Sequence, residues 1–304
     1  MSEQETRLER VLQVLSHKLM GILPTDWSSA LGARVVRQNV MANRPRIIEN
    51  ARRNLRHHKP DASEAEIEAM IGEFLDGVGR LMAEFAVMHR FVPEGRLEAR
   101  GLDAFKEIAG TRPVIAFGLH TGNWETFGPM FQASGIPLAS FYAPPSNRFE
   151  RKIAENSRAR FGVELLSPDA RGARDGLRLL RQNRVVMIFP DEARDGVVMG
   201  PLFGRPPHDR GNLAVAARLA RHSGADFVIC HSRRTAPCRF LLDFSAPFSL
   251  PPAGEGQDLL ADITFLNARI EPVVLENIPR WYFLDDAILP LERKGEAIAE
   301  DGLE

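Results

Sequence analysis

Short apolar runs alternate with amphipathic helical patterns from about residue 101 onward, and this alternation constrains the fold more than any other feature. The apolar runs lie at residues 113–119, 138–142, 163–166, 185–190 and 226–231. Helical patterns fall between them at residues 147–160, 171–182 and 212–222. Buried strands separated by helices of this length predict an α/β fold, with a mostly parallel sheet flanked by helices.

An N-terminal helical extension is predicted before this sheet. Between residues 7 and 23, apolar residues recur every three or four positions, which predicts an amphipathic helix. That helix either packs on the protein's own core or lies in a lipid interface. A further helix is predicted from Asp61 to about Met88, and Ser63 with Glu66 has the spacing of a capping box at its start. We therefore divide the chain into a helical region at 1–100, an α/β domain at 101–290 and a charged tail at 291–304.

Charge is balanced overall but not locally. The chain has 39 basic and 40 acidic residues, whereas residues 34–59 hold eight Lys or Arg and a single acid, Glu49. This segment suits lipid phosphates, or it forms the solvated face of a helix. Nucleic acid is not expected as a partner, because the segment lacks the aromatic residues that stack on bases.

Other bulk features narrow the possible functions. The longest apolar stretches fall short of the roughly 18 to 20 residues that a membrane-spanning helix needs, so membrane association is expected to be peripheral. Two cysteines, Cys230 and Cys238, do not form a recognisable metal-ligand set. Neither a metal nor an organic cofactor is indicated, because no glycine-rich phosphate loop occurs either.

The chemical centre is predicted where the first strand of the α/β region ends. The apolar run 114–119 leads directly into His120, and Glu125 follows five residues later. Catalytic groups collect at strand ends in α/β folds. With Gly122 allowing a tight turn, Glu125 is expected to accept a hydrogen bond from one imidazole nitrogen and leave the other as a base. The alternatives are a core histidine and an acid that merely favours a helix N-terminus.

The spacing of His120 and Glu125 is not specific by itself, because His89 and Glu94 share it. The surrounding residues are more specific. The sequence Gly-Leu-His-Thr-Gly-Asn-Trp-Glu at residues 118–125 resembles the signature block of the bacterial lipid A late acyltransferases, within the lysophospholipid acyltransferase superfamily. Further blocks of similarity lie at residues 142–147, Arg158, 189–191 and 201–207. The resemblance covers roughly residues 45 to 245.

The resemblance implies roles for seven residues. His120 acts as general base with Glu125 as its partner. Arg158 stabilises the oxyanion or holds a phosphate, unless it is simply a charge on a helix surface. Asp191 positions Arg158 or another basic group, unless it only forms a turn. Substrate-binding roles are assigned to Asn123, Tyr142 and Arg205, with shaping of the turn as the alternative for Asn123.

The expected reaction is transfer of a fatty acyl chain from an acyl thioester, on acyl carrier protein or CoA, to a hydroxyl of a lipid A precursor. The expected location is the cytoplasmic face of the bacterial inner membrane. One alternative is transfer to another polar lipid, such as a lysophospholipid or an amino-acid lipid, because Ala143 stands where the family usually has an arginine. A second alternative is a thioesterase-like hydrolase, since an activated histidine can also deprotonate water. A catalytically silent membrane-binding module is a third.

Overall fold

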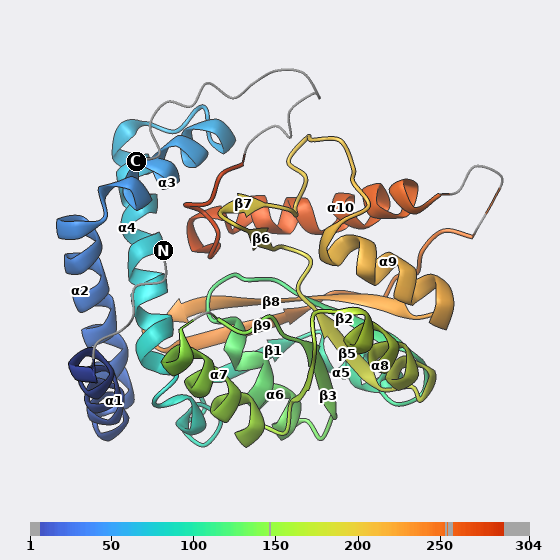
Figure 1. The fold of residues 1–304 in the computed structure, drawn as a ribbon, viewed down its shortest axis with the longest axis horizontal. Helices are drawn as coiled ribbons and strands as arrows, with labels where there is room; N and C mark the ends of the chain where they lie inside the picture. Colours follow the sequence, from blue (N-terminus) through green and yellow to red (C-terminus); the bar gives the residue numbers. More distant parts are fainter. Residues whose placement is uncertain (1–6, 146, 253, 255–257, 289–304) are drawn as a thin grey trace.

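A seven-stranded sheet forms the centre of the protein in a computed structural model, which describes residues 7–145, 147–252, 254 and 258–288 (Figure 1). The strand order is β1-β9-β8-β2-β5-β3-β4, and every pair is parallel except β8 with β9. The predicted fold class is therefore confirmed. The seven strands are β1 (Leu97–Arg100), β2 (Val114–Gly118), β3 (Leu138–Phe141), β4 (Glu164–Leu166), β5 (Val185–Ile188), β8 (Asp226–Ala236) and β9 (Arg239–Phe244).

The central strand β2 shows why its sequence is an uninterrupted apolar run. All five of its residues are buried. Ile115 and Phe117 face a core shared with the helices α8 to α10, whereas Val114 and Ala116 face a second core shared with α5 and α6. A strand covered on both faces has no solvated side, so polar alternation is absent.

Helices cover both faces of the sheet. The helices within the α/β region are α5 (Leu102–Ile108), α6 (Phe127–Ala133), α7 (Arg148–Arg160), α8 (Ala170–Arg181), α9 (Gly211–Ser223) and α10 (Leu259–Glu276). Short 3₁₀ turns are η1 (Met88–Arg90), η2 (Trp124–Thr126) and η3 (Ile278–Arg280), and a small hairpin joins β6 (Ala193–Arg194) to β7 (Val197–Val198). The three helices predicted in this region correspond to α7, α8 and α9.

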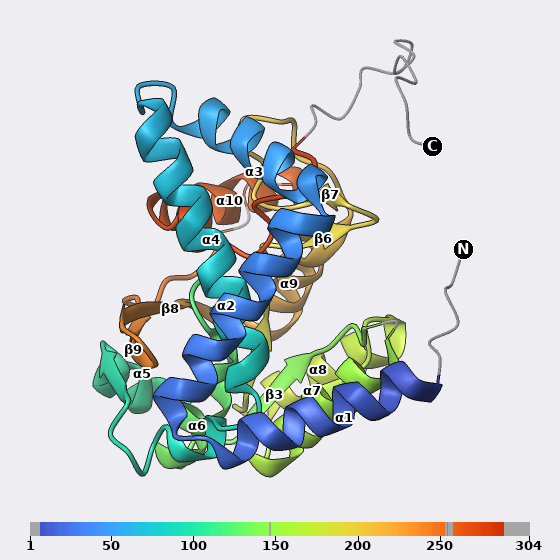
Figure 2. The same ribbon diagram turned by 90° about the vertical axis from the view of Figure 1, so that its left-hand side faces the viewer.

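The predicted N-terminal extension consists of four helices. They lie on the side of the molecule that faces the viewer in Figure 2. They are α1 (Arg7–Ile22), α2 (Thr25–Asn43), α3 (Pro45–His58) and α4 (Glu64–Glu84). The capping box at the start of α4 is confirmed, because Ser63 and the Glu66 side chain exchange hydrogen bonds with each other's backbone N–H. Strand β1 joins the sheet just before residue 101, and the charged tail predicted at 291–304 lies outside the described residues.

The parallel order brings three of the predicted site residues to one edge. Strands β2 and β5 are neighbours, and β3 lies next to β5. Because parallel strands end on the same side, the residues that follow them meet at the carboxyl edge of the sheet. His120 follows β2, Asp191 follows β5, and Tyr142 follows β3.

None of the helices in the described ranges is both long enough and apolar enough to cross a lipid bilayer.

Close packing of α2 on α4 makes a testable prediction about stability. A Cβ atom on Gly79 of α4 would lie 2.7 Å from the Gly32 carbonyl oxygen and 2.8 Å from the Ala33 Cα of α2. Gly79→Ala should therefore lower the free energy of unfolding by about 1–3 kcal/mol. Gly72→Ala in the same helix is the matched control, because its Cβ would meet nothing within 4 Å; it should stabilise the protein by about 0.5–1 kcal/mol. Equal effects in urea titrations would show that the helices do not pack this closely.

Candidate active site

His120 is held by Asp191 at the carboxyl edge of the sheet. Its Nδ1 lies 2.9 Å from the Asp191 carbonyl oxygen and 3.0 Å from Asp191 Oδ1. The Asp191 carbonyl oxygen can only accept a hydrogen bond, and Asp191 Oδ1 accepts one as a carboxylate oxygen. Nδ1 therefore carries the proton. In the neutral ring, Nε2 is then left with its lone pair. Nε2 makes no hydrogen bond with any residue in the described ranges.

The carboxylate of Asp191 is itself fixed from two further directions. The backbone N–H of His120 donates to Asp191 Oδ2 at 2.6 Å, and the indole N–H of Trp281 donates to the same oxygen at 3.0 Å. Asp191 and Trp281 are both fully buried. A carboxylate held this way keeps both the position and the tautomer of the imidazole.

A tight turn after His120 lets the chain leave the sheet edge. Gly122 has φ of 60°, and a Cβ at this position would lie 2.4 Å from the Ser232 carbonyl oxygen. The turn is also tied to the chain after α10, since Tyr282 N–H donates to the His120 carbonyl oxygen and Gly122 N–H to that of Arg280. Glycine at position 122 is therefore required by backbone conformation and by close approach.

Aromatic rings surround the His120 imidazole. Ring centroids lie at 4.4 Å for Phe189, 4.9 Å for Trp124 and 5.0 Å for Phe283. The histidine side chain keeps 17% of its surface exposed, so a substrate can reach it. The imidazole is thus presented in an apolar surrounding but is not sealed inside the core.

The structure corrects the predicted partner of His120. Glu125 instead forms an ion pair with Arg158, with 2.6 Å between Oε1 and Nη2 and 3.2 Å between Oε2 and Nε. The indole N–H of Trp124 also donates to Glu125 Oε1, at 3.2 Å. Among the described residues, no hydrogen bond joins Glu125 to His120. The reason is topological, because β5 lies beside β2 and places Asp191 at the imidazole, while η2 directs Glu125 toward α7.

Arg158 lies between Glu125 and Tyr142. Burial lowers the pKa of the Arg158 guanidinium, but the charge and hydrogen bonds of Glu125 outweigh burial and raise that pKa overall. The guanidinium stacks 4.4 Å from the centroid of the Tyr142 ring. Burial raises the pKa of Tyr142, whose buried hydroxyl has no partner among the described residues. The Tyr142 hydroxyl is thus a buried polar group whose hydrogen bonds no described residue supplies.

A small slot of about 30 Å³ lies beside this pair. Glu125 and Arg158 are its charged lining residues, and Phe189 connects it to the His120 ring. The remaining lining is mostly apolar and consists of Trp124, Phe127, Gly128, Leu138, Ser140, Phe161, Val163 and Met187. The slot therefore places a cation at the end of an apolar surface.

Asn123 belongs to a buried network behind the site. Its amide donates to Glu84 at 2.8 Å, and its carbonyl oxygen accepts from the Glu125 backbone N–H at 3.1 Å. Glu84 also pairs with both terminal nitrogens of Arg234 and accepts from Ser29. Burial raises the pKa of Glu84, but the charge of Arg234 and these hydrogen bonds lower it overall. These contacts fix the turn that carries Glu125.

Arg205 is buried in the loop that follows β7. Its guanidinium donates to the carbonyl oxygens of Val198, Pro201 and Leu202 at 2.6 to 2.8 Å. These contacts hold the loop in shape. The predicted role of Arg205 in substrate binding stays a prediction.

Trp281, Glu84 and Arg234 are site residues that the sequence analysis missed. Glu84 carries a weak signal, because it is an acid next to an otherwise apolar end of a helix. Trp281 belongs to the cluster Arg-Trp-Tyr-Phe at residues 280–283, which is conspicuous in a chain with three tryptophans. Neither signal indicates a contact with residues 70 or more positions away.

Comparison with protein families identifies the class of this protein. A family model described as bacterial lipid A biosynthesis acyltransferase matches residues 6–287. The chain therefore belongs to the bacterial lipid A biosynthesis acyltransferase family, and it is an enzyme that transfers acyl groups. Membership implies an acyl donor and a lipid A precursor as acceptor. Comparison with curated proteins gives no significant match.

Among the residues that the structure describes, no group of three His, Cys, Asp or Glu side chains is placed to hold a metal ion.

The Glu125–Arg158 pair predicts a measurable coupling energy. The two side chains are 6% and 20% exposed, so either single substitution, Glu125→Gln or Arg158→Gln, leaves a buried charge unpaired and should cost about 3–5 kcal/mol of stability. The double variant should cost less than the sum by about 1–3 kcal/mol, measured by urea unfolding. The exposed pair Asp175 and Arg178 is the matched control, with an expected coupling below about 0.5 kcal/mol. Additive costs at Glu125 and Arg158 would contradict the pairing.

Proposed function

We propose that the protein transfers a fatty acyl chain from an acyl thioester to a hydroxyl of a lipid A precursor, with His120 as general base. The observation that carries this proposal is the orientation of the imidazole. Nδ1 is directed at two oxygen acceptors of Asp191, whereas Nε2 has no hydrogen-bond partner in the described chain, and the side chain keeps 17% of its surface exposed among aromatic rings. This is the state in which an imidazole accepts a proton.

The proposed chemistry requires no covalent acyl-enzyme. Nε2 of His120 takes the proton of the acceptor hydroxyl, and that oxygen attacks the thioester carbonyl carbon. Asp191 stabilises the imidazolium that forms. The carbon–sulfur bond then breaks, and the imidazolium returns its proton to the thiolate that leaves. General-base help of this kind contributes on the order of 10² to 10⁴ in rate.

Glu125 was predicted from sequence as the partner of His120. We assign it instead, together with Arg158, to binding the charged groups of the substrate. Arg158 supplies fixed positive charge at the slot, where it stabilises the oxyanion or holds a phosphate of the acceptor. Glu125 positions that guanidinium through two hydrogen bonds. The stacking of Tyr142 on Arg158 and its unpaired hydroxyl support a role for Tyr142 in binding the same substrate group.

We propose acyl carrier protein as the donor, with CoA as the alternative carrier, and peripheral association with the cytoplasmic face of the inner membrane. The outward faces of α1 and α2 support the association. They expose large apolar side chains, namely Leu15, Leu19, Ile22, Trp27, Leu31, Val35 and Met41. Arg34 and Arg37 lie exposed on the same stretch of α2. Apolar side chains combined with arginines suit the interface of a membrane that contains anionic lipids.

Two substitutions test the general-base proposal. His120→Gln should abolish acyl transfer, and Asp191→Asn should lower kcat by roughly 10² to 10⁴, because an amide does not stabilise the imidazolium. The assay uses purified protein, acyl carrier protein loaded with labelled lauroyl groups, and a lipid A precursor. His222→Gln on α9 and Asp195→Asn on the β6–β7 hairpin are the matched controls and should retain full activity. A His120→Gln enzyme with undiminished transfer would rule the mechanism out.

A second experiment separates the proposed acceptor from the alternatives. Mass spectrometry of lipids from cells with and without the gene should show a lipid A species that differs by one acyl chain. A difference confined to another polar lipid would favour the alternative acceptor that Ala143 suggests. Thioester consumption that is independent of any lipid would indicate a hydrolase.

Membrane association has its own test. Trp27→Ser combined with Leu31→Ser should weaken cosedimentation with phosphatidylglycerol vesicles at least tenfold, because each side chain contributes roughly 1.5–3 kcal/mol when buried. Leu260→Ser is the control, since Leu260 is an exposed apolar residue on α10, away from α1 and α2. Unchanged sedimentation of the double variant would exclude this surface as the membrane contact.

A further inference from the structure

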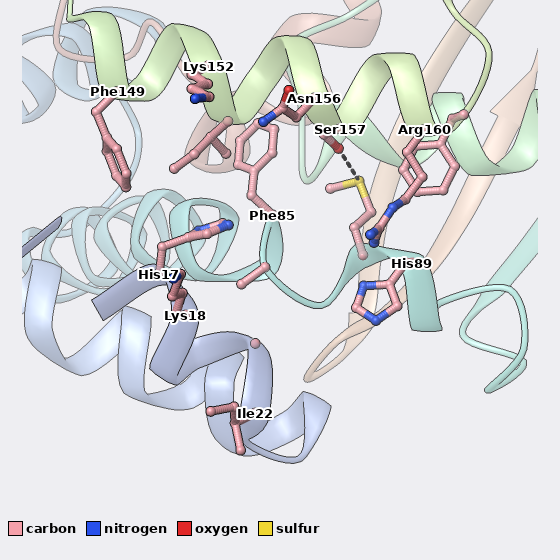
Figure 3. Close-up of a pocket in the computed structure, with 15 residues that line it drawn as sticks. His17, Lys18, Ile22, Phe85, His89, Phe149, Lys152, Asn156, Ser157 and Arg160 are labelled. Carbon is pink, nitrogen blue, oxygen red and sulfur yellow. Dashed lines mark hydrogen bonds between the residues drawn. The ribbon is translucent and has the colours of Figure 1, made fainter. Parts of the chain in front are cut away.

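A cavity of about 740 Å³ lies between α1, α7 and the segment that joins α4 to η1 (Figure 3). Phe149, Lys152, Asn156 and Arg160 project into it from α7, while His17 and Lys18 reach it from α1. Its size is typical of sites that bind small organic molecules. None of the residues of the proposed catalytic machinery lines it.

The charged side chains that line this cavity in the described chain are all basic. Lys18, Lys152 and Arg160 are exposed at its edge, and the described chain gives none of their side chains an ion pair. No acidic residue among those that the structure describes lines the cavity. His17 and His89 also border it, and burial lowers the pKa of both, so they add hydrogen-bonding groups rather than charge near neutral pH. Such an edge attracts an anionic group.

The interior of the cavity is apolar. Its walls are formed by Phe85, Met88, Phe149, Ile153 and Phe161. Inorganic phosphate would satisfy only the charged edge and leave these walls in contact with water. An amphiphile with one hydrocarbon chain and an anionic headgroup satisfies both parts.

We propose that this cavity binds an anionic membrane lipid, with one acyl chain between α1 and α7 and the phosphate at Lys18, Lys152 and Arg160. The source is the membrane itself, because α1, which forms one wall of the cavity, exposes Leu15, Leu19 and Ile22 beside it. The bound lipid is neither donor nor acceptor. The site goes beyond the proposed acyl transfer, and its occupancy does not depend on turnover.

The cavity is nevertheless connected to the candidate active site by α7. This helix carries Lys152 and Arg160 at the cavity and Arg158 at the slot beside Glu125. Phe161 lines both spaces. A lipid seated in the cavity therefore packs against the helix and the ring that also shape the slot.

Binding is tested on the full chain with His120→Gln, so that no acyl transfer can occur during the measurement. The probe is lysophosphatidylglycerol below its critical micelle concentration. Its binding is measured by calorimetry and by native mass spectrometry. We expect saturable binding of one molecule, and about fourfold weaker binding for each methylene removed from its chain. Lysophosphatidylcholine and inorganic phosphate should bind at least tenfold more weakly.

Substitutions locate the site. Lys152→Ala and Arg160→Ala should each weaken binding about fivefold. Asn156→Trp, which fills the cavity from α7, should abolish binding, and circular dichroism melting shows whether that variant folds. Arg174→Ala on the exposed face of α8 is the matched control and should bind as tightly as the parent.

Three results would overturn the proposal. The first is equal affinity for lysophosphatidylcholine, and the second is affinity for inorganic phosphate that matches that of the lipid. The third is competition by lauroyl-CoA at the same stoichiometry, because it would assign the cavity to the acyl donor. Failure of the proposed function is distinguishable, since lipid binding by the His120→Gln protein persists whether or not the parent enzyme transfers acyl groups.

Discussion

The hydrogen bonds between His120 and Asp191 depend on the order of two neighbouring parallel strands. Strands β2 and β5 are parallel neighbours and end side by side, so the residues that directly follow them lie close together. Trp281, which arrives from the end of α10, completes the arrangement by donating to the same carboxylate. A change in strand order would separate the imidazole from its acceptor, whatever the local sequence around His120.

Two carboxylates at this edge hold two different basic groups. Asp191 holds the imidazole of His120, and Glu125 holds the guanidinium of Arg158. This division gives each basic group one acidic partner and keeps the mobile proton of the imidazole apart from the permanent charge of the arginine. The buried Glu84–Arg234 pair is a third pairing of one carboxylate with one basic group, and it is joined to the site through Asn123.

Much of the fold could be predicted from periodicity, because β2 and β5 are continuous apolar runs and α7 to α9 have clear helical patterns. Strands β1 and β9 were missed, since Leu97–Arg100 alternates with exposed charged residues and Arg239–Phe244 follows a strand without a helix between. His120, Glu125, Arg158 and Asp191 were singled out from the sequence, but the acid that lies at His120 was not predicted, and Trp281, Glu84 and Arg234 were missed. Residues 120 and 125 are near each other in the chain, whereas the contact with Asp191 spans 71 positions and follows only from strand order.

The most direct test of this account is the tautomer of His120, measured by nuclear magnetic resonance of protein with ¹⁵N-labelled histidine. The His120→Gln protein identifies the resonances that belong to this ring. In the neutral ring we expect the proton on Nδ1 and a lone pair on Nε2, because the Asp191 carbonyl oxygen can only accept. A neutral ring protonated on Nε2 would contradict the account, since the nitrogen that faces the substrate could not then act as the base.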